Sequence, residues 1–275
     1  MDFFSRLEDR INTVDSLLCV GLDPDVRRLP DEVHDADLPQ WAFNRRIIDA
    51  TAEYAAAFKP NIAFYEDIEG WRSLVETVAY AHGKGVPIIL DAKRGDVGHT
   101  ARQYAGLLDA DRWQSGDAAP DAITVNPYLG ADSVQPFLER SDKGVFLLCR
   151  TSNRGGADIQ DLPLERGETV YERVADLASE WNTQGNIGLV VGATAPEELE
   201  TIRTRAPDLP FLVPGVGAQG GDIEAAVTYG TADGVGLINA SRSIIFAGEA
   251  SEQPFDAAAR SAAKRLRNQL ERYRT

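Results

Sequence analysis

Three charged residues follow one apolar segment of this chain within six positions. The apolar run 86–90 leads directly into Asp91, Lys93 and Asp96. Residues two apart on an extended strand project to the same side, so the side chains of Asp91 and Lys93 are expected to lie together. Burying charges is costly, and a buried pair is weak evidence of a stabilising role. The cluster is therefore either a solvated ion pair at a strand end or a catalytic group.

Lysine is scarce in this chain, with only five among 28 Lys and Arg residues. Two of the five, Lys59 and Lys93, come at the ends of apolar segments. Arginine would serve equally well in a salt bridge, whereas lysine can release and take up a proton. We therefore predict that at least one of them transfers a proton or stabilises charge. For Lys59 alone, an aliphatic stem packed along the core with its ammonium in water remains an alternative.

A glycine-rich segment near the C-terminus indicates an anion site. The sequence PGVGAQGGD, residues 214–222, leaves backbone amides open to close approach, and a helix is expected to follow it. Gln219 and Gly220 lie within it, and Arg242 follows the next apolar segment, suited to bidentate contact with phosphate. The pattern predicts a phosphorylated ligand, with glycines in an ordinary tight turn as the alternative.

These residues follow short apolar runs that alternate with amphipathic segments. The runs are almost continuously apolar, as expected of parallel strands covered on both faces. The expected strands are 17–22, 55–59, 86–91, 122–126, 144–149, 187–191, 211–213 and 234–238. The expected helices are 40–56, 65–82, 99–108, 133–139, 169–181, 196–205, 223–229 and 255–273.

Eight strands each followed by a helix predict an α/β fold, a (β/α)8 barrel forming one domain over residues 1–275. A further helix at 3–14 is expected to close the barrel floor. An open doubly wound sheet is the alternative, but no GxGxxG follows the first strand. The longest irregular stretch, 151–166, lies on the face where barrels carry their chemistry, and we expect it to cover the substrate.

The composition excludes several classes of function. A net charge of −15 argues against binding to nucleic acid, which needs clustered cations. The same charge suits solubility at high salt, so a halophilic source is one hypothesis and an acidic cytosolic enzyme the other. No transmembrane stretch or apolar signal region is expected, and Cys19 and Cys149 show no metal-binding spacing. A cytoplasmic location is predicted, and no metal site is expected.

Several motifs together resemble one enzyme family. DAKRGDVGHT, residues 91–100, is similar to the DxKxxDxxxT signature of the orotidine 5′-phosphate decarboxylase family. The glycine-rich segment, with the later SRSI, resembles the phosphate-binding segments of that family, and FKPNIAFYE, TVNPYLG and CRTSN resemble its longer-chain bacterial and archaeal branch. The resemblance covers residues 17–246 with the motifs in the right order. One departure is Ser241, where many members have glycine before the arginine. The resemblance implies decarboxylation of orotidine 5′-phosphate (OMP) to UMP without a metal or organic cofactor, in a homodimer.

The resemblance also assigns catalytic roles. It implies that Lys93 donates a proton to C6 of the pyrimidine and that Asp91 lies beside the substrate carboxylate. Lys59 and Asp96 complete a Lys–Asp–Lys–Asp array, with Lys59 also contacting the ribose. Asp96 and Thr100 are implied to reach the site of the partner subunit, so that the two subunits share their active sites.

The remaining implied residues bind the substrate. Asp23 is implied to contact a ribose hydroxyl and Ser152 the pyrimidine. Gln219, Gly220 and Arg242 are implied to hold the phosphate.

Three rival functions remain open. A class I aldolase would use a rim lysine as a Schiff base, which borohydride would trap. A metal-dependent decarboxylase of similar fold would lose activity in chelator. A catalytically silent nucleotide-binding barrel is disfavoured, because every expected charged position is present.

Overall fold

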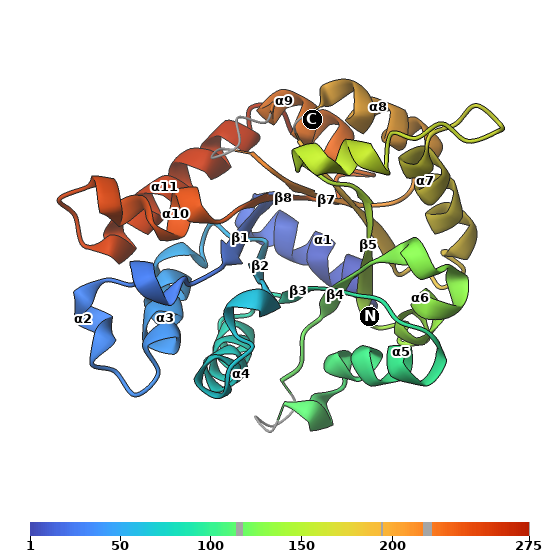
Figure 1. Cartoon of the computed structure of the whole chain (residues 1–275). Helices are drawn as coiled ribbons and strands as arrows, with labels where there is room; N and C mark the ends of the chain where they lie inside the picture. The colour runs from blue at the N-terminus through green and yellow to red at the C-terminus, as the bar shows by residue number, and fades with distance from the viewer. Residues whose placement is uncertain (114–117, 194, 217–221, 275) are drawn as a thin grey trace.

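The computed structural model describes residues 1–113, 118–193, 195–216 and 222–274. An eight-stranded parallel sheet curls into a barrel with helices around its outside (Figure 1). The strands are β1 (Leu18–Leu22), β2 (Ala57–Pro60), β3 (Ile89–Arg94), β4 (Ala122–Val125), β5 (Gly144–Arg150), β6 (Ile187–Val191), β7 (Phe211–Pro214) and β8 (Leu237–Ala240). The predicted (β/α)8 barrel is confirmed.

The ring of strands has one lightly bonded seam. Hydrogen-bonded neighbours run in the order β2-β1-β8-β7-β6-β5-β4-β3. Between β2 and β3 the described residues form only two isolated parallel bridges, Phe58 with Ile88 and Asn61 with Asp91. We call this the β2–β3 seam. The charged residues of β2 and β3 therefore face one another across the weakest ladder of the barrel.

Some of the connecting helices begin at a residue whose side chain caps the helix. The α-helices are α1 (Phe3–Val14), α2 (Asp31–His34), α3 (Pro39–Thr51), α4 (Ile68–Gly83), α5 (Gly98–Ala105), α6 (Ala131–Leu138), α7 (Val170–Trp181), α8 (Pro196–Arg205), α9 (Ile223–Gly230), α10 (Arg242–Ile245) and α11 (Phe255–Leu270). Asp67 accepts a hydrogen bond from the amide of Gly70 at the start of α4, and Thr169 with Glu172 forms a capping box on α7.

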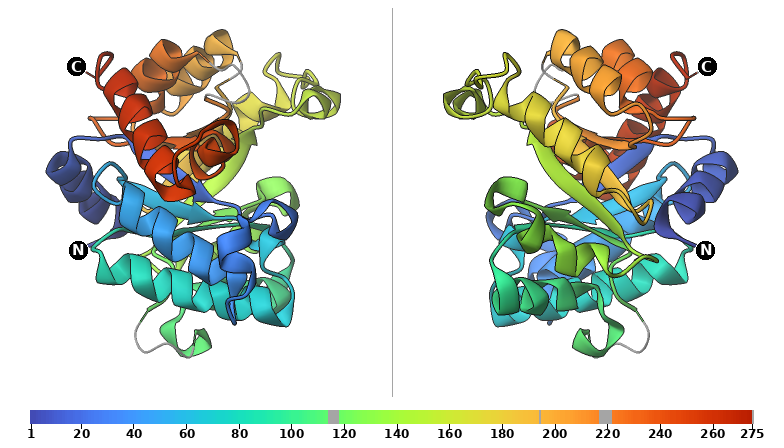
Figure 2. Two further views of the ribbon diagram at one scale, coloured as in Figure 1. Left: turned by 90° about the vertical axis from the view of Figure 1, so that its left-hand side faces the viewer. Right: turned by 90° about the vertical axis from the view of Figure 1, so that its right-hand side faces the viewer.

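Helix α1 closes one end of the barrel, as predicted. Its buried side chains Phe3, Leu7 and Ile11 form a single stripe at four-residue spacing. Phe3 meets Phe146 of β5 edge to face, with ring centroids 6.1 Å apart. Gly144 opens β5 directly beneath Phe3, and a Cβ at this position would overlap the ring. Figure 2 shows α1 on the side of the molecule away from the projecting segment that follows β5.

Several predicted bounds differ from the observed ones by a few residues. The last strand begins at Leu237 rather than 234, because Asp233 and Gly234 adopt positive φ angles of 49° and 80° and form a turn. Helix α3 ends at Thr51 rather than 56, and α4 begins three residues later than predicted, after its Asp67 cap. These differences leave the order of strands and helices unchanged.

The long segment after β5 has structure of its own. A 3-10 helix, η6 (Arg154–Asp158), follows the end of β5. Pro163 and Thr169 then form an antiparallel bridge just before α7. The segment projects outward from the barrel rim (Figure 2).

Candidate active site

The charged residues of β2 and β3 form one hydrogen-bonded array. Lys59 Nζ donates to Asp91 Oδ2 at 2.8 Å, and Lys93 Nζ donates to Asp91 Oδ1 at 2.6 Å. Thr124 of β4 also donates to Asp91 Oδ1, at 2.9 Å. The side chains of Lys59 and Asp91 are only 6% and 9% exposed, whereas that of Lys93 is 47% exposed. A buried carboxylate thus holds one buried ammonium and one that reaches solvent.

Lys93 is held in a strained backbone conformation. Its φ of +48° lies in the left-handed region, which costs a residue with a Cβ of order 1 kcal/mol. The pairing of β3 with β4 shifts between Leu90 and Arg94, so the strand is irregular at this point. The amide of Lys93 donates to Thr124 Oγ1 at 2.9 Å. The side chains of Asp91 and Lys93 do meet, but an irregular strand rather than regular alternation places them.

The charges of the array oppose the effect of burial on its pKa values. Burial by itself lowers the pKa of Lys59, but the carboxylates of Asp91 and Asp23 outweigh it and hold that pKa above its ordinary value. Burial by itself raises the pKa of Asp91, yet Lys59 and Lys93 hold it well below its usual range. The ionised form of the array is therefore favoured near neutral pH.

A cavity of about 350 Å³ opens above the array. Besides the charged array and Thr124, one wall is polar and is formed by Thr151, Ser152 and Asn153 after β5, and the remaining lining residues are apolar. The complete lining is Lys59, Asp91, Lys93, Thr124, Leu148, Thr151, Ser152, Asn153, Val190, Leu212 and Pro214. Such a site suits a flat, partly apolar ring with a few polar groups.

Asp23 lies next to this array at the end of β1. Its negative charge acts on Lys59. Its Oδ1 is buried and has no hydrogen-bond partner among the described residues. Buried polar atoms are nearly always paired, so this oxygen is available to a ligand hydroxyl. Tyr65 donates to the carbonyl oxygen of the preceding Leu22 at 2.8 Å and fixes the backbone there.

Asp96 and Thr100 lie outside the lining of the cavity. Asp96 is half-buried, and its Oδ1 accepts a hydrogen bond from the amide of Val97 at 2.7 Å. Thr100 is exposed on α5. The side chains of Val97 and Tyr128 are 56% and 79% exposed. This chain therefore brings together three of the four charges of the predicted array.

Part of the predicted phosphate site lies outside the described residues, including Gln219 and Gly220. Arg242 is described and is exposed at the start of α10, directly after β8. Gly215 has a φ of +101°, which only glycine adopts readily. Ser241 packs against Gly21, where a Cβ would lie 2.6 Å from that of Ser241. A glycine in β1 thus leaves room for the side chain of Ser241.

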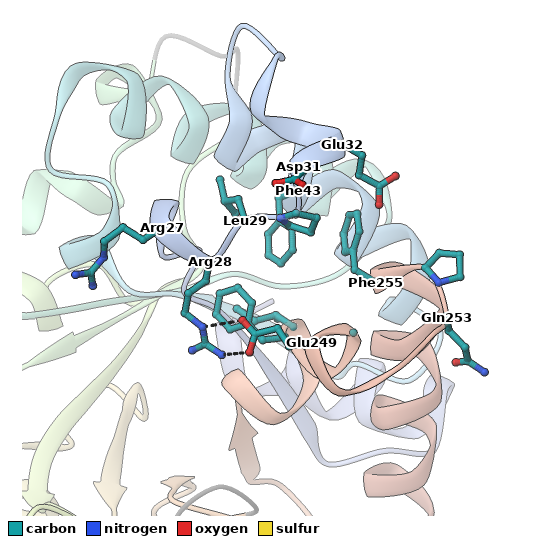
Figure 3. A pocket seen from close by; sticks show the side chains of 14 residues that line it. Arg27, Arg28, Leu29, Asp31, Glu32, Phe43, Glu249, Gln253 and Phe255 are labelled. Atoms are coloured by element: carbon teal, nitrogen blue, oxygen red, sulfur yellow. Dashed lines mark hydrogen bonds and ion pairs between the residues drawn. The ribbon is translucent and has the colours of Figure 1, made fainter.

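A larger hollow, of about 490 Å³, lies outside the barrel and contains none of these residues (Figure 3). Arg28 crosses it with a bidentate ion pair to Glu249, at 2.9 and 2.7 Å, while its guanidinium lies 3.9 Å from the centroid of Phe246. The pair ties the segment after β1 to the segment after α10. We interpret this hollow as a structural junction, because the charged array lies elsewhere.

Two further observations concern metal ions and membranes. Within residues 1–113, 118–193, 195–216 and 222–274, no group of three or more His, Cys, Asp or Glu side chains is placed to hold a metal ion. In the same described ranges, no helix has the length and apolar character needed to cross a membrane.

Residues 16–253 match the model of the "Orotidine 5'-phosphate decarboxylase / HUMPS family". The chain is 65% identical to the orotidine 5′-phosphate decarboxylase of Haloarcula marismortui and 62% identical to that of Halorubrum lacusprofundi, in each case over the full length of both chains. The chain belongs to the orotidine 5′-phosphate decarboxylase family. The predicted family and the predicted enzyme class, a carboxy-lyase, are confirmed.

Solved structures agree with this family assignment. The Leishmania donovani OMP decarboxylase superimposes with a TM-score of 0.82 at 42% identity, covering 100% of this chain and 99% of the other. The Leishmania donovani UMP synthase gives a TM-score of 0.85 at 44% identity, with this chain covering 57% of its length. The barrel is thus the decarboxylase fold.

Sequence reasoning missed Thr124, which contacts both Asp91 and Lys93. It is the polar residue in the apolar strand Ala122–Val125, and this position was the available signal. Asn126, at the end of the same strand, lines a neighbouring hollow instead of the cavity.

Proposed function

We propose that this chain decarboxylates OMP to UMP and carbon dioxide, the last step of de novo pyrimidine nucleotide synthesis, with no metal or organic cofactor. The observation that carries the proposal is the Lys59–Asp91–Lys93 array, in which Lys59 and Asp91 are buried, at the base of a cavity of about 350 Å³. The names of the relatives above support the same substrate.

The proposed reaction uses charges that are already in place. The bond between C6 and the substrate carboxylate breaks, carbon dioxide leaves, and the electron pair remains on C6. The ammonium of Lys93 stabilises this developing carbanion and then transfers a proton to C6. Charges that are already fixed in place stabilise such a change with little reorganisation. Because Lys93 is 47% exposed, solvent can return the proton to its amine.

Asp91 contributes by its position beside the departing carboxylate. A negative charge there disfavours the bound substrate more than the transition state, in which the carboxylate is becoming neutral. The ammonium of Lys59 holds Asp91 ionised. Lys59 and the unpaired oxygen of Asp23 are proposed to bind ribose hydroxyls.

Ser152, in the polar wall, is proposed to contact the pyrimidine. Arg242, together with Gln219 and Gly220, is proposed to bind the phosphate. Its place directly after β8 supports this, since loops after the seventh and eighth strands often hold phosphate in such barrels.

The decisive experiment follows the fall in ultraviolet absorbance as OMP is consumed. The wild-type protein should consume it rapidly, and Lys93→Ala should be almost inactive. Addition of a chelator should change neither rate. Comparable rates for the two proteins would contradict the assignment of Lys93, and loss of activity in chelator would contradict a metal-free reaction.

We further propose a homodimer in which Asp96 and Thr100 complete the partner's site. Both lie outside the cavity of their own chain, and Val97, the residue after Asp96, is an exposed apolar side chain. If sites are shared, mixing inactive Lys93→Ala and Asp96→Ala subunits creates one intact site per mixed dimer, restoring about a quarter of full activity. No recovery after subunit exchange would contradict sharing.

A cytoplasmic enzyme adapted to high salt is proposed on two grounds. The net charge is −15, and the relatives include enzymes of Haloarcula and Halorubrum. Screening at high ionic strength weakens the repulsion that such a surface creates.

A further inference from the structure

The polar wall of the cavity has little packing behind it. Thr151 and Leu148 line the cavity on one side and a second hollow, of about 330 Å³, on the other. Ser152 is supported from below, because it packs against Gly192, where a Cβ would lie 2.9 Å from the Ser152 Cβ. Packing therefore does not by itself fix Thr151 between two open spaces.

Gln160 supplies the missing support through hydrogen bonds. Its Oε1 accepts from the amide of Thr151 at 3.0 Å, and its Nε2 donates to Thr151 Oγ1 at 2.8 Å. Its backbone is fixed as well, since its amide donates to Gly156 and its carbonyl oxygen accepts from Tyr171 of α7. The side chain thus spans the second hollow and forms hydrogen bonds with both the amide and the hydroxyl of Thr151.

Arg150 anchors Gln160 to the barrel. Its Nη1 donates to Gln160 Oε1 at 3.1 Å. The same guanidinium makes a bidentate pair with Glu198 of α8, at 2.8 and 3.0 Å, and a further ion pair with Asp161 at 3.3 Å. The Arg150 side chain is only 11% exposed. Charge-assisted bidentate pairs fix geometry as well as adding energy, so α8 holds the orientation of Arg150.

Gly156 shows how closely this network is packed. It is buried on η6, and a Cβ there would lie 2.8 Å from Arg150 Nη1, 3.0 Å from Gln160 Oε1 and 3.1 Å from Thr151 Oγ1. A methyl group at this position would push on all three polar atoms.

We propose that Gln160 is a positioning residue for recognition of the pyrimidine. Held by Arg150, it fixes Thr151 and so the orientation of Ser152 and Asn153 against the base. The inference rests on the proposed function. A group held by its supporting contacts loses binding strength when they are removed, even though it remains present.

The test uses two substitutions at one position. Gln160→Met keeps the length of the side chain and removes its hydrogen bonds. Gln160→Glu keeps an acceptor for Arg150 and for the Thr151 amide, and the Thr151 hydroxyl can donate to its second oxygen. The matched control is Glu165→Gln in the same segment, whose exposed side chain makes no hydrogen bond or ion pair with the described residues. Gly156→Ala is a second way to disturb the network.

We expect weaker binding of the pyrimidine base and unchanged binding of the ribose phosphate. Gln160→Met and Gly156→Ala should raise the KM for OMP and the Ki of UMP about tenfold. Inhibition by ribose 5-phosphate, which lacks the base, should change less than twofold in both, relative to the control. Gln160→Glu should restore values near those of the wild-type protein.

Three results would overturn the inference. These are an unchanged Ki of UMP in Gln160→Met, equal weakening of UMP and ribose 5-phosphate, or a Gln160→Glu variant as impaired as Gln160→Met. A wild-type protein that does not decarboxylate OMP would instead refute the proposed function.

Discussion

Asp91→Asn should destabilise the fold far more than the loss of one surface charge. The substitution removes the carboxylate that lies 2.8 Å from the buried ammonium of Lys59. Removing one partner of a buried pair and leaving the other charge uncompensated costs about 3–5 kcal/mol. The remaining charge of Asp23 acts on Lys59 as well, so we expect the lower end of that range. Lys93 contributes less to this cost, because it is 47% exposed and can turn to water.

Removing the second charge should recover much of that loss. In Lys59→Met/Asp91→Asn no buried ammonium remains, and replacing both members of a buried pair is often close to neutral. We expect the double variant to be at least about 2 kcal/mol more stable than Asp91→Asn. Lys59→Met alone should be milder, since Asp91 keeps Lys93 and Thr124.

Urea unfolding followed by tryptophan fluorescence, at fixed salt and pH 7, measures these differences. The pKa of Lys59 is raised in the fold, so its contribution is present below its ordinary value and lost only in alkali. The pKa of Asp91 is lowered, so its contribution is present above its ordinary value and lost only in acid. The differences in unfolding free energy among the wild-type protein and the three variants should therefore stay constant from roughly pH 5 to pH 9.

A double variant no more stable than Asp91→Asn would refute the reasoning about the uncompensated charge. Activity provides a separate readout. All three variants should lose almost all OMP decarboxylation, because each lacks at least one charge of the array and recovered stability does not restore it.

Gly144→Ala should lower the free energy of unfolding in urea by about 1–3 kcal/mol, because its methyl group overlaps the ring of Phe3. Gly83→Ala, where nothing lies within 4 Å of the new methyl group, should be neutral or slightly stabilising. Equal effects would contradict the packing of α1. Burial by itself raises the pKa of Asp121. Its hydrogen bonds with His82 and with the amide of Ile88 nevertheless hold that pKa below its ordinary value. Its contribution is thus lost as pH falls through the folded pKa, and Asp121→Asn should lose less stability than the wild-type protein between about pH 5 and pH 3. The melting temperature should rise as KCl increases from about 0.1 M to about 2 M, where screening is nearly complete, and a flat or falling series would contradict adaptation to salt.

The order of strands and helices could be predicted because each strand is a short apolar run between amphipathic segments. The exact bounds could not. The segment 234–238 looks like a strand, but the positive φ angles at Asp233 and Gly234 come from a turn that composition does not specify. Helix α3 likewise ends at Thr51 although alanines continue the helical pattern.

Some residues of the candidate site could likewise be predicted from the sequence, and others could not. Lys59, Asp91 and Lys93 could be predicted, because lysine is rare and strand ends converge at one rim. The strained backbone of Lys93 was not predictable, since it depends on a shift in pairing with β4. The support of Thr151 by Gln160 was also beyond sequence reasoning, because it joins two loop positions through hydrogen bonds that no periodicity marks.

The β2–β3 seam has a consequence for local opening of the barrel. A closed ring opens first where its ladder is thinnest, and here the ion pair between Lys59 and Asp91 spans that gap. Local opening of the seam would separate these charges, so the amides of β2 and β3 should exchange with deuterium together. A nucleotide bound across the array should slow that exchange more than exchange in β6 or β7. The charges that we assign to catalysis would then also act as a latch on the barrel.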